Sequence, residues 1–559
     1  MKQQNNHSFN QLFENSIKEN WDKNALTDFN GATLQYHDVA RKIEKIHIIF
    51  EKADIKKGDK IALCGRNSSM WGVVFLAVET YGAVSVPVQN EFTPEQIYNI
   101  VNHSDAKLLF AGDVVLPTLD FERMPALQGM FLNPDISLPF SRSENLTYAR
   151  EHLNELYGDK FPKYFRKEHV SYYHDEPDEL AMINYTSGTT GFSKGVMIPY
   201  RALWNNADWA LNAIGTKLKK DSKVLEILPM GHMYGMVCEF FLQFLLGNHI
   251  HFLTRLPSPS VIQKAFQDIH PNIVVSVPLI IEKIIRKNVL PVANSAKMKL
   301  LMKLPGINTK VKQQLYDMVN ELMGGQPYEI LTGGASFSKE VEDFLLSIGY
   351  PTTAGYGTTE TAPLITYSDY NVFRPGSCGT AVQNMEVKIL NPNPENGSGE
   401  LLARGMNVML GYYKNDEATK AVLDEEGWFH TGDLARIDES GHCYILGRIK
   451  NMLLGSNGQN VYPEEVEDKL NSMVLVDESL MLQKGNKFYC LVYPDKEEAA
   501  KMGLTDEDLR NVMEENRKQL NNQLPSFCRI AEIRLYDKEF EKTPKRSIKR
   551  YLYKDAIDA

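Results

Sequence analysis

Short apolar runs that suit β-strands alternate along much of the chain with longer stretches that suit helices. Residues 60–64 predict a strand, 71–81 a helix and 83–88 a second strand. The same alternation returns over residues 224–253 and continues to residue 287. This order predicts α/β layers built on largely parallel sheets. Residues 112–179 are less periodic and hold several prolines, and we expect them to form excursions over the surface.

The pattern changes from Asn391, where the turn-rich stretch NPNPENGSGE precedes a series of short strands. Farther on, residues 464–470 and 505–523 predict helices and residues 487–493 a strand. We therefore predict a large N-terminal domain of layered α/β sheets plus a β-rich subdomain over residues 1–449. A small, mobile α+β C-terminal domain is predicted over residues 450–559, a size that can fold alone.

Composition excludes several classes of protein. A length of 559 residues exceeds what one core usually supports, and the net charge of −10 argues against a general nucleic-acid binder. Six scattered cysteines without a CxxC pair predict neither a disulfide framework nor a zinc site, which fits a reducing cytosol. The most apolar stretch, residues 236–253, contains Glu239 and is broken by Gly247. We expect a cytoplasmic protein with at most peripheral membrane contact.

The stretch with the most chemistry is YTSGTTGFSKGVMIPY, residues 185–200. Its three glycines free the backbone to turn and present N–H groups, while hydroxyls and a lysine add donors and positive charge. The Walker spacing is absent, and the flanks predict two strands. A surface hairpin loop would also be rich in these residues. We favour a polyphosphate site made by Thr186, Ser187, Gly188, Thr189, Thr190, Gly191 and Lys194.

This string resembles the phosphate-loop signature of the adenylate-forming superfamily of acyl-CoA synthetases, luciferases and peptide-synthetase adenylation domains. Matching stretches follow in the family's order: LTGGA at 331–335, GYGTTET at 355–361, WFHTGD at 428–433 and GR at 447–448. The stretch GRIKNMLLGSNGQNVYPEEVE is most similar to bacterial long-chain fatty acyl-CoA ligases. The resemblance extends from the middle of the chain almost to its end, and the N-terminal third matches more loosely.

The two glycine groups both follow predicted strands, where ligands of α/β sheets usually bind. Glycines let a flat base approach the backbone, and Tyr356 offers a face for stacking. Glu360 is a hard oxygen ligand suited to Mg²⁺, and the resemblance implies that Thr186 helps to hold that ion. Taken alone, Glu360 would be a solvated carboxylate and Tyr356 a core aromatic. The predicted nucleotide-binding residues here are Gly333, Gly334, Ala335, Gly355, Tyr356, Gly357 and Thr358.

Three further residues take their roles from the resemblance. Asp433 is implied to bind the ribose hydroxyls, although such aspartates are more often caps or turn formers. Arg448 is implied to contact ribose or phosphate. Lys450 stands where the family keeps its hinge residue, about which the C-terminal domain swings between an adenylation and a thioester-forming conformation.

The stretch LPMGHMYG, residues 228–235, contains His232, which in the family borders the acyl site. The family usually has an aromatic residue where this chain has Gly231. The apolar helix predicted over residues 234–246 suits either plain core or an adaptable alkyl tunnel. No aspartate stands where peptide-synthetase domains hold an α-amino group, which disfavours an amino-acid substrate.

The resemblance breaks near the C-terminus, where the family carries T-P-x-x-K-I-x-R. Its lysine bridges substrate carboxylate and α-phosphate, and this chain has Ser547 there, either naturally or by engineering. Lys545 and Lys549 are near in sequence but offset. Leu454 is a milder departure, since many relatives have lysine there.

The resemblance implies an ATP- and Mg²⁺-dependent fatty acyl-CoA ligase whose substrates are a fatty acid, ATP and CoA. Two alternatives stay open: an acyl-AMP ligase that loads a carrier-protein thiol, and a weakly catalytic acyl-nucleotide-binding protein, for which Ser547 is the motive. The predicted catalytic positions are Lys194, His232, Glu360 and Ser547.

Overall fold

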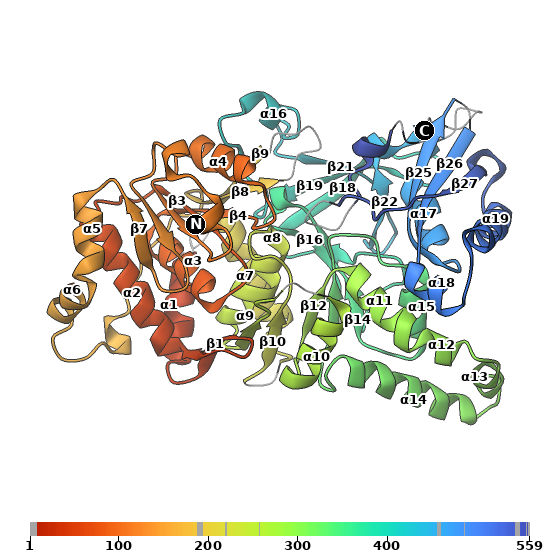
Figure 1. Cartoon of the computed structure of the whole chain (residues 1–559), viewed down its shortest axis with the longest axis horizontal. Helices are drawn as coiled ribbons and strands as arrows, with labels where there is room; N and C mark the ends of the chain where they lie inside the picture. Colours follow the sequence, from red (N-terminus) through yellow and green to blue (C-terminus); the bar gives the residue numbers. More distant parts are fainter. Residues whose placement is uncertain are drawn as a thin grey trace.

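The computed structural model describes residues 8–186, 194–218, 221–255, 258–454, 460–485, 487–542, 548–554 and 556. An eight-stranded sheet in the order β20-β9-β8-β4-β3-β5-β6-β7 forms the centre of the N-terminal part (Figure 1). Its parallel strands are β3 (Lys60–Cys64), β4 (Val84–Val88), β5 (Leu108–Ala111), β6 (Gly129–Leu132) and β8 (Leu180–Thr186). Strand β7 (Ser137–Ser141) pairs antiparallel with β6, β9 (Lys194–Pro199) antiparallel with β8, and β20 (Gly411–Tyr412) antiparallel with β9.

Both faces of this sheet are buried, which explains why its strands are apolar without alternation. Ile61 and Leu63 belong to the core on one face, and Ala62 and Cys64 to the core on the other. Helix α3 (Ser69–Tyr81) covers the first face and α4 (Pro94–His103) the second. The strands and the helix predicted over residues 60–88 are confirmed, with α3 ending at Gly82 in the left-handed conformation.

The expectation that residues 112–179 run only over the surface is wrong. Strand β6 pairs with β5 inside the sheet, and Met130 and Phe131 are fully buried. Strand β7 extends this edge, and α5 (Glu144–Glu151) and α6 (Leu153–Lys160) follow. A four-residue strand is too short to display a period, and the prolines around it hid the signal.

A second sheet has the order β10-β11-β1-β2. Strands β10 (Lys223–Glu226) and β11 (His249–Phe252) were predicted, and β1 (Asn24–Asp28) and β2 (Thr33–Gln35) complete the sheet. Helix α2 (Tyr36–Lys52) contacts β1 and β2, and α1 (Phe9–Glu19) contacts α2 and α7 (Tyr200–Ala213). The helix predicted over residues 234–246 is formed by α8 (Met233–Gly235), a π-helical turn (Met236–Phe241) and α9 (Leu242–Leu245).

A third, parallel sheet consists of β12 (Val274–Ser276), β13 (Ile330–Thr332) and β14 (Thr352–Ala354). Its surrounding helices are α10 (Pro259–Ile269), α11 (Pro278–Asn288), α12 (Leu290–Ala293), α13 (Ala296–Leu301), α14 (Ile307–Leu322) and α15 (Lys339–Ser347). The β-rich region follows, with β15 (Tyr356–Gly357), β16 (Leu364–Tyr367) and β17 (Thr380–Ala381), then the antiparallel sheet of β18 (Met385–Leu390), β19 (Gly399–Gly405), β21 (Phe429–Ile437) and β22 (Cys443–Arg448). Helix α16 (Asp416–Lys420) lies between β20 and β21.

The C-terminal part has its own core and its own sheet (Figure 1). Strands β25 (Val476–Lys484), β26 (Lys487–Pro494) and β27 (Ile530–Leu535) pack against α17 (Pro463–Asn471), α18 (Lys496–Lys501) and α19 (Asp506–Gln523). The short pair β23 (Leu453–Leu454) and β24 (Asn460–Val461) precedes them. The predicted fold class, a large α/β part with a β-rich region and a small α+β C-terminal domain, is confirmed. Within the described residues, every helix is too short or too polar to cross a bilayer.

Candidate nucleotide and acyl site

The predicted phosphate loop connects β8 to β9, so its flanks are two antiparallel strands. Thr186 pairs with Lys194 at the open end of this ladder. Ser187, Gly188, Thr189, Thr190 and Gly191 lie outside the described residues. The two described members of the loop therefore stand opposite each other on neighbouring strands, at the mouth of the hairpin.

Lys194 contacts Tyr412, a residue that lies outside every motif of the sequence analysis. Its Nζ lies 4.7 Å from the centroid of the Tyr412 ring, and the Tyr412 hydroxyl donates to Oε1 of Glu360 at 2.9 Å. Tyr412 is buried, and burial together with the Glu360 carboxylate raises its pKa. Strand β20, which carries Tyr412, pairs with β9, which carries Lys194. Tyr412 thus connects two of the predicted site residues.

The two glycine groups lie side by side at the carboxyl ends of β13 and β14. A Cβ at Gly333 would lie 3.2 Å from Cζ of Tyr234 and 3.4 Å from the Gly355 carbonyl oxygen, and Gly334 has φ +82°. Ala335 is exposed at the same edge. Gly334 and Ala335 are therefore accessible at this edge, whereas Gly333 packs against Tyr234.

At Gly357 and Thr358, contacts within the protein already account for the residue type. A Cβ at Gly357 would lie 1.7 Å from the Pro363 carbonyl oxygen, so packing alone excludes a side chain. The Thr358 hydroxyl is buried at 3.2 Å from Oγ1 of Thr361. Glu360 follows in the next turn, where Tyr412 contacts it.

Asp433 and Arg448 form a cross-strand pair between β21 and β22. Arg448 Nε lies 2.8 Å from Asp433 Oδ1, and the Tyr356 hydroxyl donates to Asp433 Oδ2 at 2.5 Å. Asp433 is 3% exposed. Burial and the neighbouring Asp433 carboxylate raise the pKa of Tyr356, so its hydroxyl keeps its proton. A carboxylate has about four acceptor positions, so Asp433 can accept further hydrogen bonds.

Lys450 lies close to this pair, in the turn after β22. Partial burial lowers its pKa, and the positive charges of Arg448 and Lys194 lower it further, while Asp433 opposes the shift. Arg448 thus pairs with the buried carboxylate, and Lys450 lies within electrostatic range of Arg448, Asp433 and Lys194. Such a cluster suits a ligand with several negative charges.

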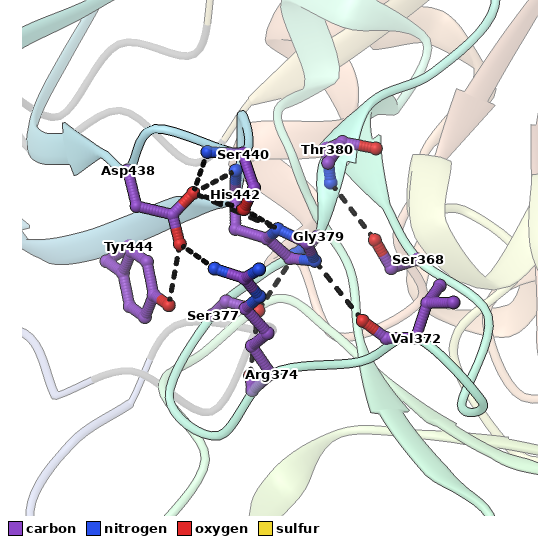
Figure 2. A network of polar contacts seen from close by, with 10 residues as sticks. All are labelled: Ser368, Val372, Arg374, Ser377, Gly379, Thr380, Asp438, Ser440, His442 and Tyr444. Atoms are coloured by element: carbon purple, nitrogen blue, oxygen red, sulfur yellow. Dashed lines mark hydrogen bonds and ion pairs between the residues drawn. The ribbon is translucent and has the colours of Figure 1, made fainter.

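A polar network fixes the turn that joins β21 to β22 (Figure 2). Asp438 accepts hydrogen bonds from Ser440 N at 2.9 Å, Ser440 Oγ at 2.7 Å and His442 N at 3.0 Å. Arg374 Nη1 lies 2.8 Å from its second oxygen, and the Tyr444 hydroxyl 3.2 Å. These donors hold the pKa of Asp438 far below its ordinary value. The turn thereby ties the strands of Asp433 and Arg448 to the loop that contains Arg374.

His232 begins the short helix α8 and accepts a hydrogen bond at Nδ1 from the Tyr234 N–H at 3.2 Å. The Tyr234 hydroxyl reaches the carbonyls of Ser276 at 3.2 Å and Leu331 at 3.3 Å, which ties this segment to the third sheet. A Cβ at Gly231 would lie 2.9 Å from Gln89 Cα. The backbone that follows β4 thus leaves no room for the aromatic residue that the family usually has.

The C-terminal lysine position, Ser547, and its neighbour Lys545 lie outside the described residues. Lys549 is described, and it bonds Glu541 twice, through its N–H at 2.8 Å and its ammonium at 3.4 Å. Arg550 forms an ion pair with the buried Glu467, whose pKa burial raises to about 7. Both described cations of this stretch are therefore engaged within the C-terminal domain.

The chain is similar to known proteins along most of its length. The model of the AMP-binding enzyme family matches residues 13–413, and that of the AMP-binding enzyme C-terminal domain matches residues 450–559. The long-chain-fatty-acid–CoA ligase ACSBG2 of Xenopus laevis is 26% identical over 523 residues, covering 87% of this chain and 69% of that protein.

Two solved structures share the fold. The anthranilate CoA ligase AuaEII in complex with anthranoyl-AMP has a TM-score of 0.78 at 17% identity, covering 99% of this chain and 97% of that one. ATP-bound MatB from Rhodopseudomonas palustris has a TM-score of 0.74 at 20% identity, covering 98% of each chain. The adenylate-forming resemblance is confirmed, and the chain belongs to the AMP-binding enzyme family.

Proposed function

We propose that this protein is a fatty acyl-CoA ligase that uses ATP, Mg²⁺ and CoA. The observation that carries the proposal is the buried Asp433, which pairs with Arg448 and accepts from the hydroxyl of Tyr356, the residue that follows Gly355 at the end of the third sheet. The cations of Lys450 and Lys194 lie nearby. This arrangement supports a nucleotide site in which the cations bind phosphates, Asp433 accepts from ribose and the glycine edge contacts the base. The relatives named as long-chain fatty acid ligases support the choice of acid.

In this proposal, Lys194 and the loop around it bind the β- and γ-phosphates, and Arg448 binds ribose or phosphate. Asp433 accepts from the ribose hydroxyls, held in place by the Tyr356 hydroxyl. Glu360 and Thr186 offer the oxygen ligands that Mg²⁺ prefers, and the ion would neutralise charge that develops on the phosphates. His232 borders the acyl group.

The reaction has two steps. A carboxylate oxygen of the acid attacks the α-phosphorus of ATP, and pyrophosphate leaves, giving acyl-AMP. The sulfur of CoA then attacks the acyl carbonyl, loses its proton, and AMP leaves with the electrons of the broken C–O bond. The residues of the site contribute position and charge stabilisation rather than covalent chemistry.

The acyl chain is proposed to be medium or long. The helix after His232 is buried throughout, but Phe240, Phe241 and Phe244 pack on Phe9, Phe13 and Phe75 in the core. We therefore expect other residues of this region to contact the chain. Each buried methylene should add about 0.8 kcal/mol until the binding space ends. A substrate screen that peaks at acetate or an amino acid would contradict this assignment.

A single assay separates the proposal from its alternatives. Pyrophosphate release is measured with a panel of fatty acids, and the products are identified by mass spectrometry with and without CoA. Acyl-CoA supports a CoA ligase, and acyl-AMP that persists with CoA supports a carrier-loading enzyme. Binding without turnover supports a weakly catalytic protein. Rescue by Ser547→Lys of roughly a hundredfold or more would attribute slow adenylation to that position.

Lys194→Ala tests the phosphate role. We expect it to raise the ATP KM or slow adenylation by roughly ten- to a thousandfold, the scale of one preorganised charge. The matched control is Lys388→Ala, which likewise removes an ammonium that lies over an aromatic ring, 4.0 Å from the ring centroid of Trp428. Equal effects of the two substitutions would show that Lys194 acts only through packing on Tyr412.

A cytoplasmic location is part of the proposal. The six cysteines are all unpaired thiols, and five are buried, which suits a reducing compartment. Fractionation of the cells that produce the protein tests this.

A further inference from the structure

The segment of residues 290–312, here called the lysine arm, comprises α12, α13 and the start of α14. Figure 1 shows it at the lower right end of the molecule, away from the eight-stranded sheet. Leu290, Met298 and Val311 are buried and belong to the large core of the N-terminal part. The second half of α14 runs back along α10. The arm is therefore anchored by one apolar face.

Three further large apolar residues of the arm are exposed. Leu300 is 63% exposed, Ile307 41% and Leu304 40%. All three lie within eight positions, on the end of α13, the connection that follows and the first residue of α14. Exposed apolar side chains contribute no hydrophobic stabilisation to the fold. A cluster of three of them therefore indicates a surface that binds another apolar surface, such as a protein or a membrane.

Charge around these residues is of one sign. Lys297, Lys299, Lys303, Lys310 and Lys312 lie in the arm, which has no Asp or Glu, whereas the whole chain has a net charge of −10. None of the five forms an ion pair within 4.0 Å among the described residues. Carboxylates resume only at Asp317 and Glu321, in the later turns of α14. The exposed leucines are thus flanked by cations that no carboxylate neutralises.

We propose that the lysine arm docks on a membrane surface that contains anionic lipid. Leu300, Leu304 and Ile307 enter the interface between headgroups and acyl chains, and the lysines bind the phosphates and carboxylates of the headgroups. An acidic protein is a poorer fit, because the apolar residues stand on a projecting end and would need a cavity shaped to receive them. A lipid bilayer is fluid, so it can accommodate a projecting apolar segment without a preformed cavity.

Vesicle cosedimentation of the full chain tests the proposal without any reference to catalysis. We expect binding to mixed phosphatidylcholine–phosphatidylserine vesicles, weak binding to phosphatidylcholine alone, and release in high salt, because exposed charges are screened. The result is independent of the proposed ligase activity, which is measured separately with a soluble medium-chain acid. If the full chain binds vesicles but shows no ligase activity, the proposed function is contradicted and the docking surface is not.

Two sets of variants assign the binding to the arm. Lys297→Glu, Lys299→Glu and Lys303→Glu together should lower the partition coefficient at least about tenfold. Their control is the triple exchange of the exposed Lys52, Lys518 and Lys538 for Glu, which changes the net charge equally. Serine at Leu300, Leu304 and Ile307 should lower binding by a similar factor.

The apolar control replaces Val372, Val474 and Met502 by serine, residues that are 62%, 62% and 57% exposed elsewhere. All substituted side chains are exposed, and melting temperatures check that the variants fold. The proposal fails if the chain ignores anionic vesicles, or if the control sets reduce binding as much as the arm sets. It also fails if the arm binds an acidic carrier protein but no vesicle.

Discussion

Tyr412 lies between two residues of opposite charge, Lys194 and Glu360, and contacts both. The ring lies under the Lys194 ammonium, and the hydroxyl donates to Glu360. The ring face attracts the cation, and the hydrogen bond fixes the carboxylate. Lys194 and Glu360 need such an intermediary, because the structure gives no ion pair between them. The position of both charged groups therefore depends on Tyr412.

Tyr412→Phe separates these two contacts. It keeps the ring under Lys194 and removes the donor to Glu360, and we expect kcat/KM for ATP in pyrophosphate release to fall roughly tenfold. Tyr413→Phe is the matched control, because its hydroxyl donates to the exposed Asp105 at 3.0 Å. If both variants behave alike, the hydroxyl of Tyr412 does not serve the site.

The contrast between Asp433 and Tyr412 shows what a sequence can reveal about a site. Gly333 and Gly355 lie in local motifs directly after strands, so their proximity follows from the order of elements, and Asp433 lies in a local motif of its own within β21. Tyr412 touches Glu360 across 52 positions, from a two-residue strand without a pattern of its own. Gly357 was predicted as a ligand-facing glycine, but the Pro363 carbonyl already requires a glycine there.

A buried carboxyl pair makes stability depend on pH. Glu226 and Glu239 are both fully buried, and Glu239 Oε2 accepts from the N–H groups of Ile227 at 3.0 Å and Leu228 at 2.8 Å. Both oxygens of Glu226 lack a hydrogen-bond partner among the described residues. Burial raises the pKa of each well above the ordinary 4.5, and the Glu239 carboxylate raises that of Glu226 further.

The sign of the effect follows from proton binding. Above about pH 4.5 the unfolded chain releases the proton of Glu226 while the folded protein retains it, so the free energy of unfolding falls as pH rises. Glu226→Gln removes this dependence. We expect the difference in Tm between variant and wild type to become more positive from pH 5 to pH 8, by calorimetry. The exposed Glu425→Gln should show no such trend, and a flat difference for Glu226→Gln would contradict the pKa shift.

At the scale of elements, the β21–β22 hairpin carries both Asp433 and Arg448, and its turn determines how rigidly they are held. Asp438 accepts from backbone, hydroxyl and guanidinium donors in and around that turn (Figure 2). His442 Nε2 also reaches the Val372 carbonyl at 3.3 Å. The site therefore depends on a polar network that does not touch it.

Asp438→Asn should loosen the hairpin. An asparagine amide offers one acceptor oxygen and no charge. Arg374 therefore loses its ionic partner, and the donors that now share two carboxylate oxygens must compete for one. We expect a lower Tm and a several-fold higher ATP KM, at an unchanged product pattern. The control Asp537→Asn, at an exposed carboxylate, should change neither quantity. An effect on Tm without any on KM would limit the network to stability.

Elements differ in how far the sequence predicts them. Strand β3 and helix α3 have long uniform apolar runs and were predicted within two residues. Strand β6 was missed, because its pairing with β5 depends on residues far from it and not on its own period. The π-helical turn over Met236–Phe241 also has no signature in composition. It contains Glu239, whose carboxylate accepts from the backbone N–H groups of Ile227 and Leu228, and a contact of this kind cannot be predicted from the sequence.

At the scale of the whole molecule, α11 joins the C-terminal domain to the rest. Arg286 donates to the Asn471 carbonyl at 3.2 Å and to Ser338 Oγ at 2.8 Å, and Lys283 Nζ lies 3.1 Å from Asp477 Oδ1. Both side chains are partly exposed, so each contact contributes about 0.2–1 kcal/mol. Contacts this weak can hold one orientation of the domain and still release it. This is what a hinge at Lys450 would require.

Lys283→Ala combined with Arg286→Ala should therefore shift the balance between two orientations of the C-terminal domain. A loss of about 1 kcal/mol changes their ratio roughly fivefold. Because two orientations would serve two steps, we expect the rate of acyl-AMP formation and the rate of conversion of supplied acyl-AMP and CoA to change in opposite directions, measured separately by stopped flow. Lys339→Ala is the control, since its ammonium pairs with Asp343 inside α15 at 3.1 Å. A parallel loss in both steps would mean that α11 merely stabilises the fold, and unchanged rates would show that the contacts of Lys283 and Arg286 do not set the orientation.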